Sequence, residues 1–209
     1  LVRRALLPPV SPSAPLFRPL LGLGSSFSAR TSYDLAVPGE TGYSLMDAFA
    51  GRGFDVWTMD HEGYGKSTQT EGWSYIADGV EDLKAAVGVV ERETGAASYA
   101  FFGTSSGALR AGAFCNARPD RVERLALGAL VWTGKDSPTL IKRAERIKEG
   151  QATNRRAVDE AFYQGVFTRD ITGLTIPELP AVAAAAEMRN GGGSVPNGTY
   201  VDMCINLPV

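Results

Sequence analysis

Apolar residues follow two different spacings along this chain. Short, largely apolar runs occur at residues 20–23, 54–59, 98–102 and 122–132, and each is typical of a buried strand. Elsewhere apolar residues recur every three or four positions, as in amphipathic helices, and glycine-rich turns separate the two kinds of segment. This alternation predicts an α/β fold, in which crossover helices connect the strands of a mostly parallel sheet.

Two helices are predicted with clear limits. The first covers residues 75–94, where one apolar stripe is formed by Ile76, Val80, Leu83, Val87 and Val90. Gly95 follows this stripe and ends the helix. The second covers residues 106–117, whose small side chains allow close packing against a sheet, and Pro119 and Asp120 mark its end. The two helices lie directly before and after a predicted strand.

The pattern changes after Trp132. Residues 138–149 and 152–167 have helical periodicity and many charges, with no strand predicted between them, and residues 181–188 continue the helical character. Three consecutive glycines from Gly191 then form a flexible break. We therefore divide the chain into an irregular N-terminal segment at 1–19, an α/β core at 20–134 and a helical cap at 135–205.

Composition and charge narrow the range of partners. The chain has 209 residues, 44% of them apolar, which suits one well-buried core. A net charge of −2 provides no positive field for nucleic acid or anionic lipid, so a small molecule is the expected partner. No apolar run approaches the roughly 20 residues that a membrane-spanning helix needs. The pattern leaves the oligomeric state open.

The N-terminal residues and the cysteines both favour a cytoplasmic location. Four prolines interrupt the first apolar stretch and leave no region typical of a signal peptide, namely Pro8, Pro9, Pro12 and Pro15. The chain begins with Leu1, which suggests that its natural start is missing. Cys115 and Cys204 are too few and too far apart to form a disulfide framework or a metal site, so we expect reduced thiols.

The candidate chemistry lies in the sequence Gly103-Thr104-Ser105-Ser106-Gly107. This is a G-x-S-x-G motif between a predicted strand and a predicted helix, which is the context of a nucleophile elbow. A sharp reversal of the backbone at Ser105 leaves room only for small residues two positions away on either side. We expect Ser105 to be a catalytic nucleophile; the alternative is an ordinary strand-to-helix loop of small polar residues.

A nucleophilic serine also needs N–H donors for the oxyanion that follows attack. The backbone N–H of Ser106, at the start of the predicted helix, is the first candidate donor. The backbone N–H of Ser25, in the turn after residues 20–23, is the second candidate. The alternative is that this segment is an ordinary glycine-serine turn.

Three segments together resemble the alpha/beta-hydrolase family between about residue 20 and residue 132. They are Leu23-Gly24-Ser25-Ser26, Asp60-His61-Glu62-Gly63-Tyr64-Gly65-Lys66-Ser67 and the motif at Ser105. The resemblance implies a doubly wound sheet, a pocket between sheet and cap, a Ser-His-acid triad and no cofactor. It also implies that Phe162, Tyr163 and Phe167 either line this pocket or pack between helices.

The sequence departs from the family pattern at two points. Leu23 stands where family members usually carry histidine, and no histidine follows Ser105, although the family's triad order is serine, acid, histidine. His61, the sole histidine, is interpreted as a hydrogen-bonding residue of its turn, and Asp60 and Glu62 as turn-forming acids. We expect the triad acid and histidine to lie beyond residue 209.

These observations predict a serine hydrolase that cleaves a small carboxylic ester or related acyl substrate through a Ser105 acyl-enzyme. Asp136 is an alternative acid on chain order alone. Without a histidine base, the 209-residue polypeptide should be inactive or nearly so. The alternative function is a non-catalytic ligand-binding or interaction protein on a hydrolase scaffold. A nucleotide-binding protein is disfavoured, because no phosphate-binding glycine motif follows a strand.

Overall fold

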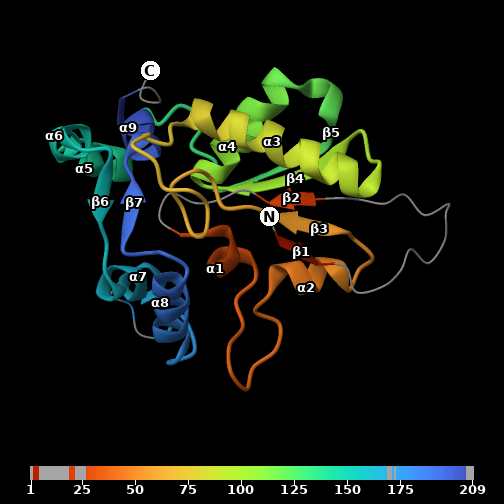
Figure 1. The fold of residues 1–209 in the computed structure, drawn as a ribbon. Helices are drawn as coiled ribbons and strands as arrows, with labels where there is room; N and C mark the ends of the chain where they lie inside the picture. Colours follow the sequence, from red (N-terminus) through yellow and green to blue (C-terminus); the bar gives the residue numbers. More distant parts are fainter. Residues whose placement is uncertain (1, 5–18, 22–26, 169–170, 172, 206–209) are drawn as a thin grey trace.

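The computed structural model describes residues 2–4, 19–21, 27–168, 171 and 173–205. In this part of the chain a five-stranded sheet has the order β1-β3-β2-β4-β5. The strands are β1 (Val2–Arg4), β2 (Pro19–Leu21), β3 (Val56–Thr58), β4 (Tyr99–Thr104) and β5 (Val122–Gly128). Only β1 runs antiparallel to its neighbour, and the other pairs are parallel. The predicted α/β fold is therefore confirmed (Figure 1).

Helices cover both faces of this sheet (Figure 1). On one face lie α3 (Ile76–Thr94) and α4 (Ser106–Ala117), and on the other lie α1 (Ala29–Tyr33) and α2 (Leu45–Ala50). The two predicted helices at 75–94 and 106–117 are thus confirmed. Gly95 ends α3 in the left-handed conformation at φ 70°, which a residue without Cβ adopts at little cost.

The described residues form one apolar cluster on each face of the sheet and a third that joins the loop after α1 to residues 176–186. The first joins α3 to the strands through side chains such as Leu83, Val87 and Phe101. The second joins α1 and α2 to β3 through Tyr33, Met46 and other buried residues. Most of the α3 residues in the first cluster recur every three or four positions, as the sequence pattern predicted.

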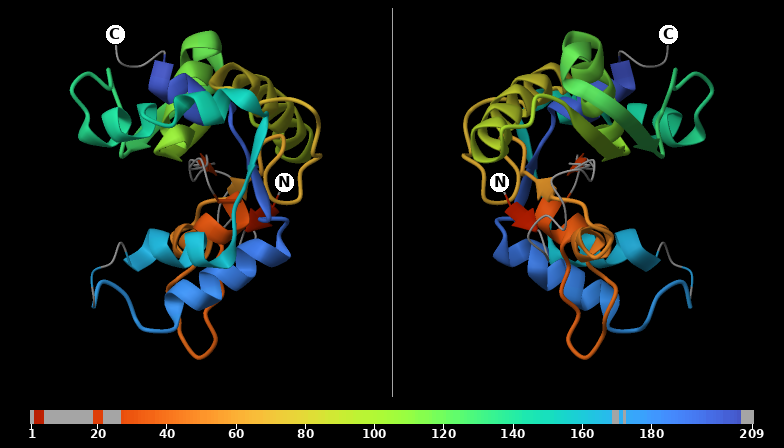
Figure 2. Two further views of the ribbon diagram at one scale, coloured as in Figure 1. Left: turned by 90° about the vertical axis from the view of Figure 1, so that its left-hand side faces the viewer. Right: turned by 90° about the vertical axis from the view of Figure 1, so that its right-hand side faces the viewer.

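Residues 135–205, which we call the cap segment, form two groups of helices. The first group is α5 (Pro138–Ala144), α6 (Ile147–Ala152) and α9 (Gly198–Ile205), and the second is α7 (Glu160–Thr168) and α8 (Leu179–Arg189). A two-stranded ribbon of β6 (Arg155–Ala157) and β7 (Ser194–Pro196) joins the groups. The second group lies near α1, whereas the first lies near the ends of α3 and α4 (Figures 1 and 2).

Three sequence predictions need correction. Residues 1–19 were predicted to be irregular, yet residues 2–4 pair with β3 and Pro19 begins β2. The strand predicted at 122–132 ends at Gly128, because Ala129 takes a positive φ of 50°. Residues 152–167 were predicted to be helical throughout, but residues 155–157 form β6 and helix α7 begins at Glu160; the partner strand β7 is far along the chain, so local periodicity does not reveal β6.

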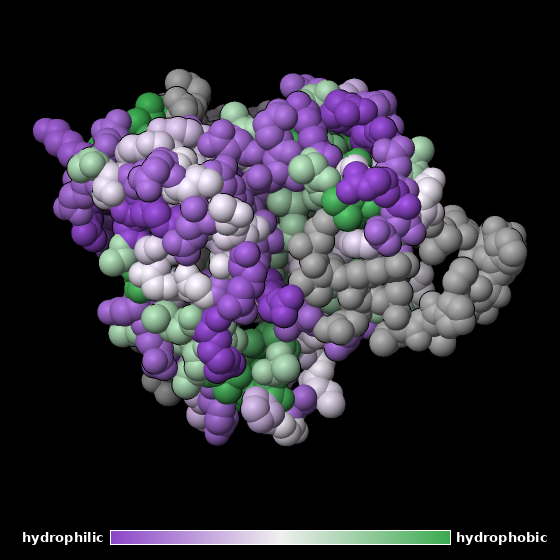
Figure 3. Space-filling model, viewed as in Figure 1, coloured by the Kyte–Doolittle hydropathy of each residue, from purple (hydrophilic) through white to green (hydrophobic). Residues whose placement is uncertain are grey.

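The described surface has a mixed polar and apolar character. No helix among the described residues is long and apolar enough to cross a membrane. Hydrophilic residues dominate the face shown in Figure 3, and hydrophobic residues appear between them in small groups.

Candidate active site

Ser105 lies at a sharp reversal of the backbone between β4 and α4. Its φ of 53° and ψ of −123° lie in a region that side-chain-bearing residues rarely adopt. Backbone hydrogen bonds hold the reversal: the Ser105 N–H donates to the carbonyl of Gly128 at 3.0 Å, and the Ser105 carbonyl accepts from the N–H groups of Ala108 and Leu109 at 3.0 and 3.3 Å. The bend is therefore fixed by the neighbouring strand and by the first turn of the helix.

The first glycine of the motif, Gly103, makes this bend sterically possible. A Cβ on Gly103 would lie 2.7 Å from the carbonyl carbon of Gly107 and 2.8 Å from the nitrogen of Ala108. Real Cβ atoms do not approach backbone atoms so closely, so no side chain fits at this position. The strand can pass under the helix only because residue 103 is glycine.

The three serines of the predicted site differ in what the structure describes. Ser105 is half-buried. Ser106 is the first residue of α4, where backbone N–H groups point out of the helix end, and its own side chain is buried. Ser25 lies outside the described residues.

His61 is buried away from solvent and bound to a carboxylate. Its side chain is 0% exposed, and Nδ1 lies 3.0 Å from Oδ2 of Asp82 on α3. The same oxygen accepts the N–H of Glu62 at 3.0 Å. Burial, followed by the charge of Arg110, lowers the pKa of His61 to about 4. His61 is therefore a neutral, hydrogen-bonded structural residue at pH 7, in agreement with its interpretation from sequence.

Asp60 organises the turn that follows β3. Its Oδ1 accepts the N–H of Ala29 at 2.7 Å, and its Oδ2 accepts the N–H of Lys66 at 3.0 Å. A Cβ at Gly65, whose φ is 51°, would overlap the Asp60 carboxylate. The interpretation of Asp60 as a turn-forming acid holds, and the turn is also fastened to the start of α1.

Asp136 does not join Ser105 in the structure. It is exposed in the loop after β5, with a left-handed backbone at φ 58°. Among the described residues no hydrogen bond connects Asp136 to Ser105. The site therefore contains neither a histidine nor an acid in contact with the candidate nucleophile within the described part of the chain.

Two buried charged residues near the site were not identified from sequence. The first is Arg110 on α4, which is 1% exposed. Its Nη2 donates to the carbonyl and hydroxyl of Ser74 at 2.7 and 2.9 Å, and to the hydroxyl of Thr199 at 2.9 Å. The side chain thus ties the helix after Ser105 to the cap segment. The one available signal was a lone arginine among small residues.

The second is Glu187 on α8, which is also 1% exposed. Its carboxylate accepts the N–H of Ser28 at 2.8 Å and the hydroxyl of Ser28 at 2.7 Å. Burial raises the pKa of this carboxyl, and the charge of Asp60 adds to the rise. An alanine-rich helix gave no sequence signal that an acid within it would be buried.

The cap aromatics divide between packing and exposure. Tyr163 is fully buried, packs against Phe27 in a tilted arrangement at a centroid distance of 4.9 Å, and donates a hydrogen bond from its hydroxyl to the carbonyl of Gly192 at 2.7 Å. Phe167 packs against the same Phe27 ring at 5.7 Å, whereas Phe162 is 40% exposed. Tyr163 is thus a packing residue, the second of the two roles that the sequence left open.

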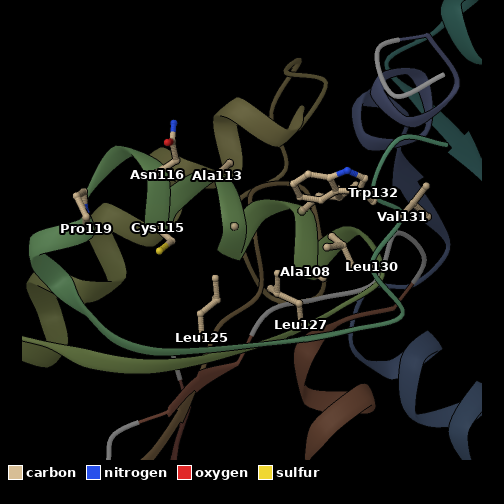
Figure 4. Close-up of a pocket in the computed structure, with 12 residues that line it drawn as sticks. Ala108, Ala113, Cys115, Asn116, Pro119, Leu125, Leu127, Leu130, Val131 and Trp132 are labelled. Atoms are coloured by element: carbon tan, nitrogen blue, oxygen red, sulfur yellow. The ribbon is translucent and has the colours of Figure 1, made fainter. Parts of the chain in front are cut away.

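An apolar pocket of about 590 Å³ lies beside the site, between α4 and β5 (Figure 4). Ala108, Leu125, Leu127 and Trp132 are among its lining residues, and Ser105 is not. Trp132 is 83% exposed at its rim. Since the candidate nucleophile does not line it, this pocket is not assigned to the substrate. No cluster of metal-ligating side chains occurs among the described residues.

A family model described as Serine aminopeptidase, S33, matches residues 41–174, which is more than half of the chain. The match includes the turn at Asp60, the motif at Ser105 and the first part of the cap segment. Among curated protein sequences, none matches this chain.

Several solved structures of similar fold are hydrolases. A hydrolase from Pseudomonas aeruginosa PA01 has a TM-score of 0.60 and 18% identity, over 98% of this chain and 67% of its own. E-2-(acetamidomethylene)succinate hydrolase has a TM-score of 0.55 and 18% identity, over 91% and 63%. An esterase from Thermogutta terrifontis has a TM-score of 0.57 and 17% identity, over 90% and 64%. This chain thus spans less than two thirds of the second and third, and at such identities the likeness establishes the fold.

Proposed function

Because this chain belongs to the serine aminopeptidase S33 family of alpha/beta hydrolases, we propose that it is a serine hydrolase acting through Ser105. Its substrate is a small molecule with a carboxylic ester or related acyl group. The observation that carries the proposal is the strained backbone of Ser105, at φ 53° and ψ −123°, on a half-buried residue between strand and helix. Such strain persists where surrounding contacts impose it, and it is concentrated at functional sites.

The proposed chemistry is acyl transfer. The Ser105 oxygen attacks the substrate carbonyl, and the bond to the leaving group breaks to give an acyl-enzyme that water then hydrolyses. The oxyanion is stabilised by the backbone N–H of Ser106, supported by its place in the first turn of α4, and by the N–H of Ser25. These donors act through the backbone, so their side chains take no part in the reaction.

The proton of Ser105 has to go to a base that is not His61. One ring nitrogen of His61 is bound to Asp82, the ring is 0% exposed, and its pKa is about 4. A histidine and an acid from residues beyond 209 supply the rest of the triad in this proposal. It follows that the 209-residue polypeptide alone is inactive or nearly so.

One observation favours a second function. The sole histidine is committed to a structural hydrogen bond, as a non-catalytic ligand-binding protein on this scaffold would allow. The two functions differ in whether the protein made from its whole reading frame turns over a substrate.

Hydrolysis of p-nitrophenyl butyrate by that protein tests the proposal. We expect Ser105→Ala to lower kcat by about 10⁴-fold or more, as the loss of a serine nucleophile does. The matched control is Ser44→Ala, which removes a serine hydroxyl that caps α2 and should leave kcat unchanged. Equal rates for wild type and Ser105→Ala would refute the hydrolase function, and the absence of turnover in wild type would favour the binding protein.

A further inference from the structure

A buried carboxylate joins the cap segment to the start of α1. Glu187 on α8 and Ser28 are 1% and 0% exposed, and both Glu187 oxygens accept hydrogen bonds from Ser28, at 2.8 and 2.7 Å. Ser28 is also the residue that caps α1. Removing a carboxylate from water is unfavourable unless its oxygens accept hydrogen bonds, so the geometry of this contact is tightly constrained.

The partners of Glu187 are N–H and hydroxyl groups. Within the part of the chain that the structure describes, no ion pair involves Glu187, and the charge that acts on it is the carboxylate of Asp60. Phe27, directly before Ser28, packs against Tyr163 and Phe167 of α7. The start of α1 is therefore held from both helices of the nearby cap group.

The short helix α1 begins at this contact, and its last side chain reaches the residue before Ser105. Its first residue, Ala29, donates its N–H to Asp60 at 2.7 Å. At its last residue, the hydroxyl of Tyr33 lies 2.9 Å from the hydroxyl oxygen of Thr104. One helical segment of five residues thus connects a residue fixed by the cap with the residue that precedes the candidate nucleophile.

We infer that Glu187 is a positioning residue for the reaction at Ser105. It fixes Ser28, and through α1 it sets where the Tyr33 hydroxyl meets Thr104 and so where the strained bend is held. The role rests on the proposed function, because it concerns the rate at which Ser105 reacts. A displacement of reacting groups by about 1 Å costs on the order of 10²-fold in rate, so small shifts of α1 are measurable.

A double-mutant cycle on the protein from its whole reading frame tests this role, with kcat and KM for p-nitrophenyl butyrate as readouts. Glu187→Leu removes both acceptors and keeps an apolar side chain in the space. Tyr33→Phe removes the hydroxyl at Thr104. We expect each to lower kcat by about 10-fold with KM unchanged, and the double variant to lose about 10-fold rather than about 100-fold, because both act through α1.

Two further variants separate positioning from general destabilisation. Glu187→Gln keeps an oxygen for the Ser28 N–H and an amide that donates to the Ser28 hydroxyl, so kcat should stay within about 3-fold of wild type. Glu178→Leu changes an exposed acid at the start of the same helix and should leave kcat unchanged. Should Glu187→Leu not fold, Ser28→Ala takes its place in the cycle, since it removes the hydroxyl contact to Glu187 together with the cap hydrogen bond from the Thr31 N–H, and both contacts fix the start of α1.

Losses that multiply to about 100-fold, or an unchanged kcat in the Glu187→Leu or replacement Ser28→Ala variant, would overturn the inference. Ser105→Ala in the same assay keeps this outcome apart from failure of the proposed function. If Ser105→Ala is inactive while the cycle shows no coupling, Ser105 is the nucleophile and Glu187 has no role in positioning it.

Discussion

The backbone bend at Ser105 and the buried hydrogen bonds at Ser28 both require a tightly constrained geometry. The residues that impose this geometry lie at very different distances along the chain. At the bend, Gly103 meets the backbone of Gly107, four residues away in the chain. At Ser28, the partner Glu187 is 159 residues away. A short sequence motif determines the steric constraints between residues close in the chain. A hydrogen bond between buried groups far apart in the chain depends on how the whole chain folds. The comparison therefore separates what local sequence determines from what tertiary structure determines.

We expect the largest stability effect at Arg110. It lies on α4, the helix of the motif, but its hydrogen-bond partners are far away in the chain. Arg110→Ala removes three hydrogen bonds to Ser74 and Thr199 and leaves a cavity, so we expect the free energy of unfolding to fall by about 4 kcal/mol. Urea denaturation measures this loss. Arg118→Ala, at the C-terminal end of the same helix, is the control and should lower the midpoint far less, because its ion pair with Asp120 lies at the surface. A similar midpoint for both variants would show that the long-range contacts contribute little.

The pH dependence of the free energy of unfolding tests the burial of His61. Its pKa is about 4 in the folded protein and about 6.5 in the unfolded chain, so between these values only the unfolded chain binds the proton. The free energy of unfolding should therefore fall by about 3 kcal/mol as the pH is lowered from about 6.5 to about 4. Wild type is compared with His61→Asn, whose amide still donates to Asp82 but does not titrate. Equal pH dependence in the two proteins would contradict the buried, neutral state of His61.

Much of the fold followed from the sequence because its signals are local. The stripe in residues 75–94 predicted α3, and the strand before the G-x-S-x-G motif predicted the bend at Ser105. The ribbon of β6 and β7 was missed, because each strand has three residues and its partner is distant. Glu187 was missed for the same reason: its burial depends on Ser28, which no local pattern connects to α8.

Gly103 gives the smallest of the three stability effects and tests the short-range side. A Cβ there meets backbone that cannot move without disturbing α4, so Gly103→Ala should cost about 2 kcal/mol. Gly112→Ala is the matched control in α4, where a Cβ would meet nothing within 4 Å and should stabilise the helix by roughly 0.5–1 kcal/mol. Thermal denaturation of both variants gives the comparison. Gly103→Ala at wild-type stability would show that the close approach is not required.

The assignment of Ser105 as the nucleophile is tested most directly with a fluorophosphonate probe. The measurement identifies which residue the probe modifies in the protein from its whole reading frame. Mass spectrometry of the digested adduct locates the modification. We predict a single adduct on the peptide that contains Ser105, absent from Ser105→Ala. An adduct on another residue, or labelling that persists in Ser105→Ala, would contradict the assignment of the nucleophile.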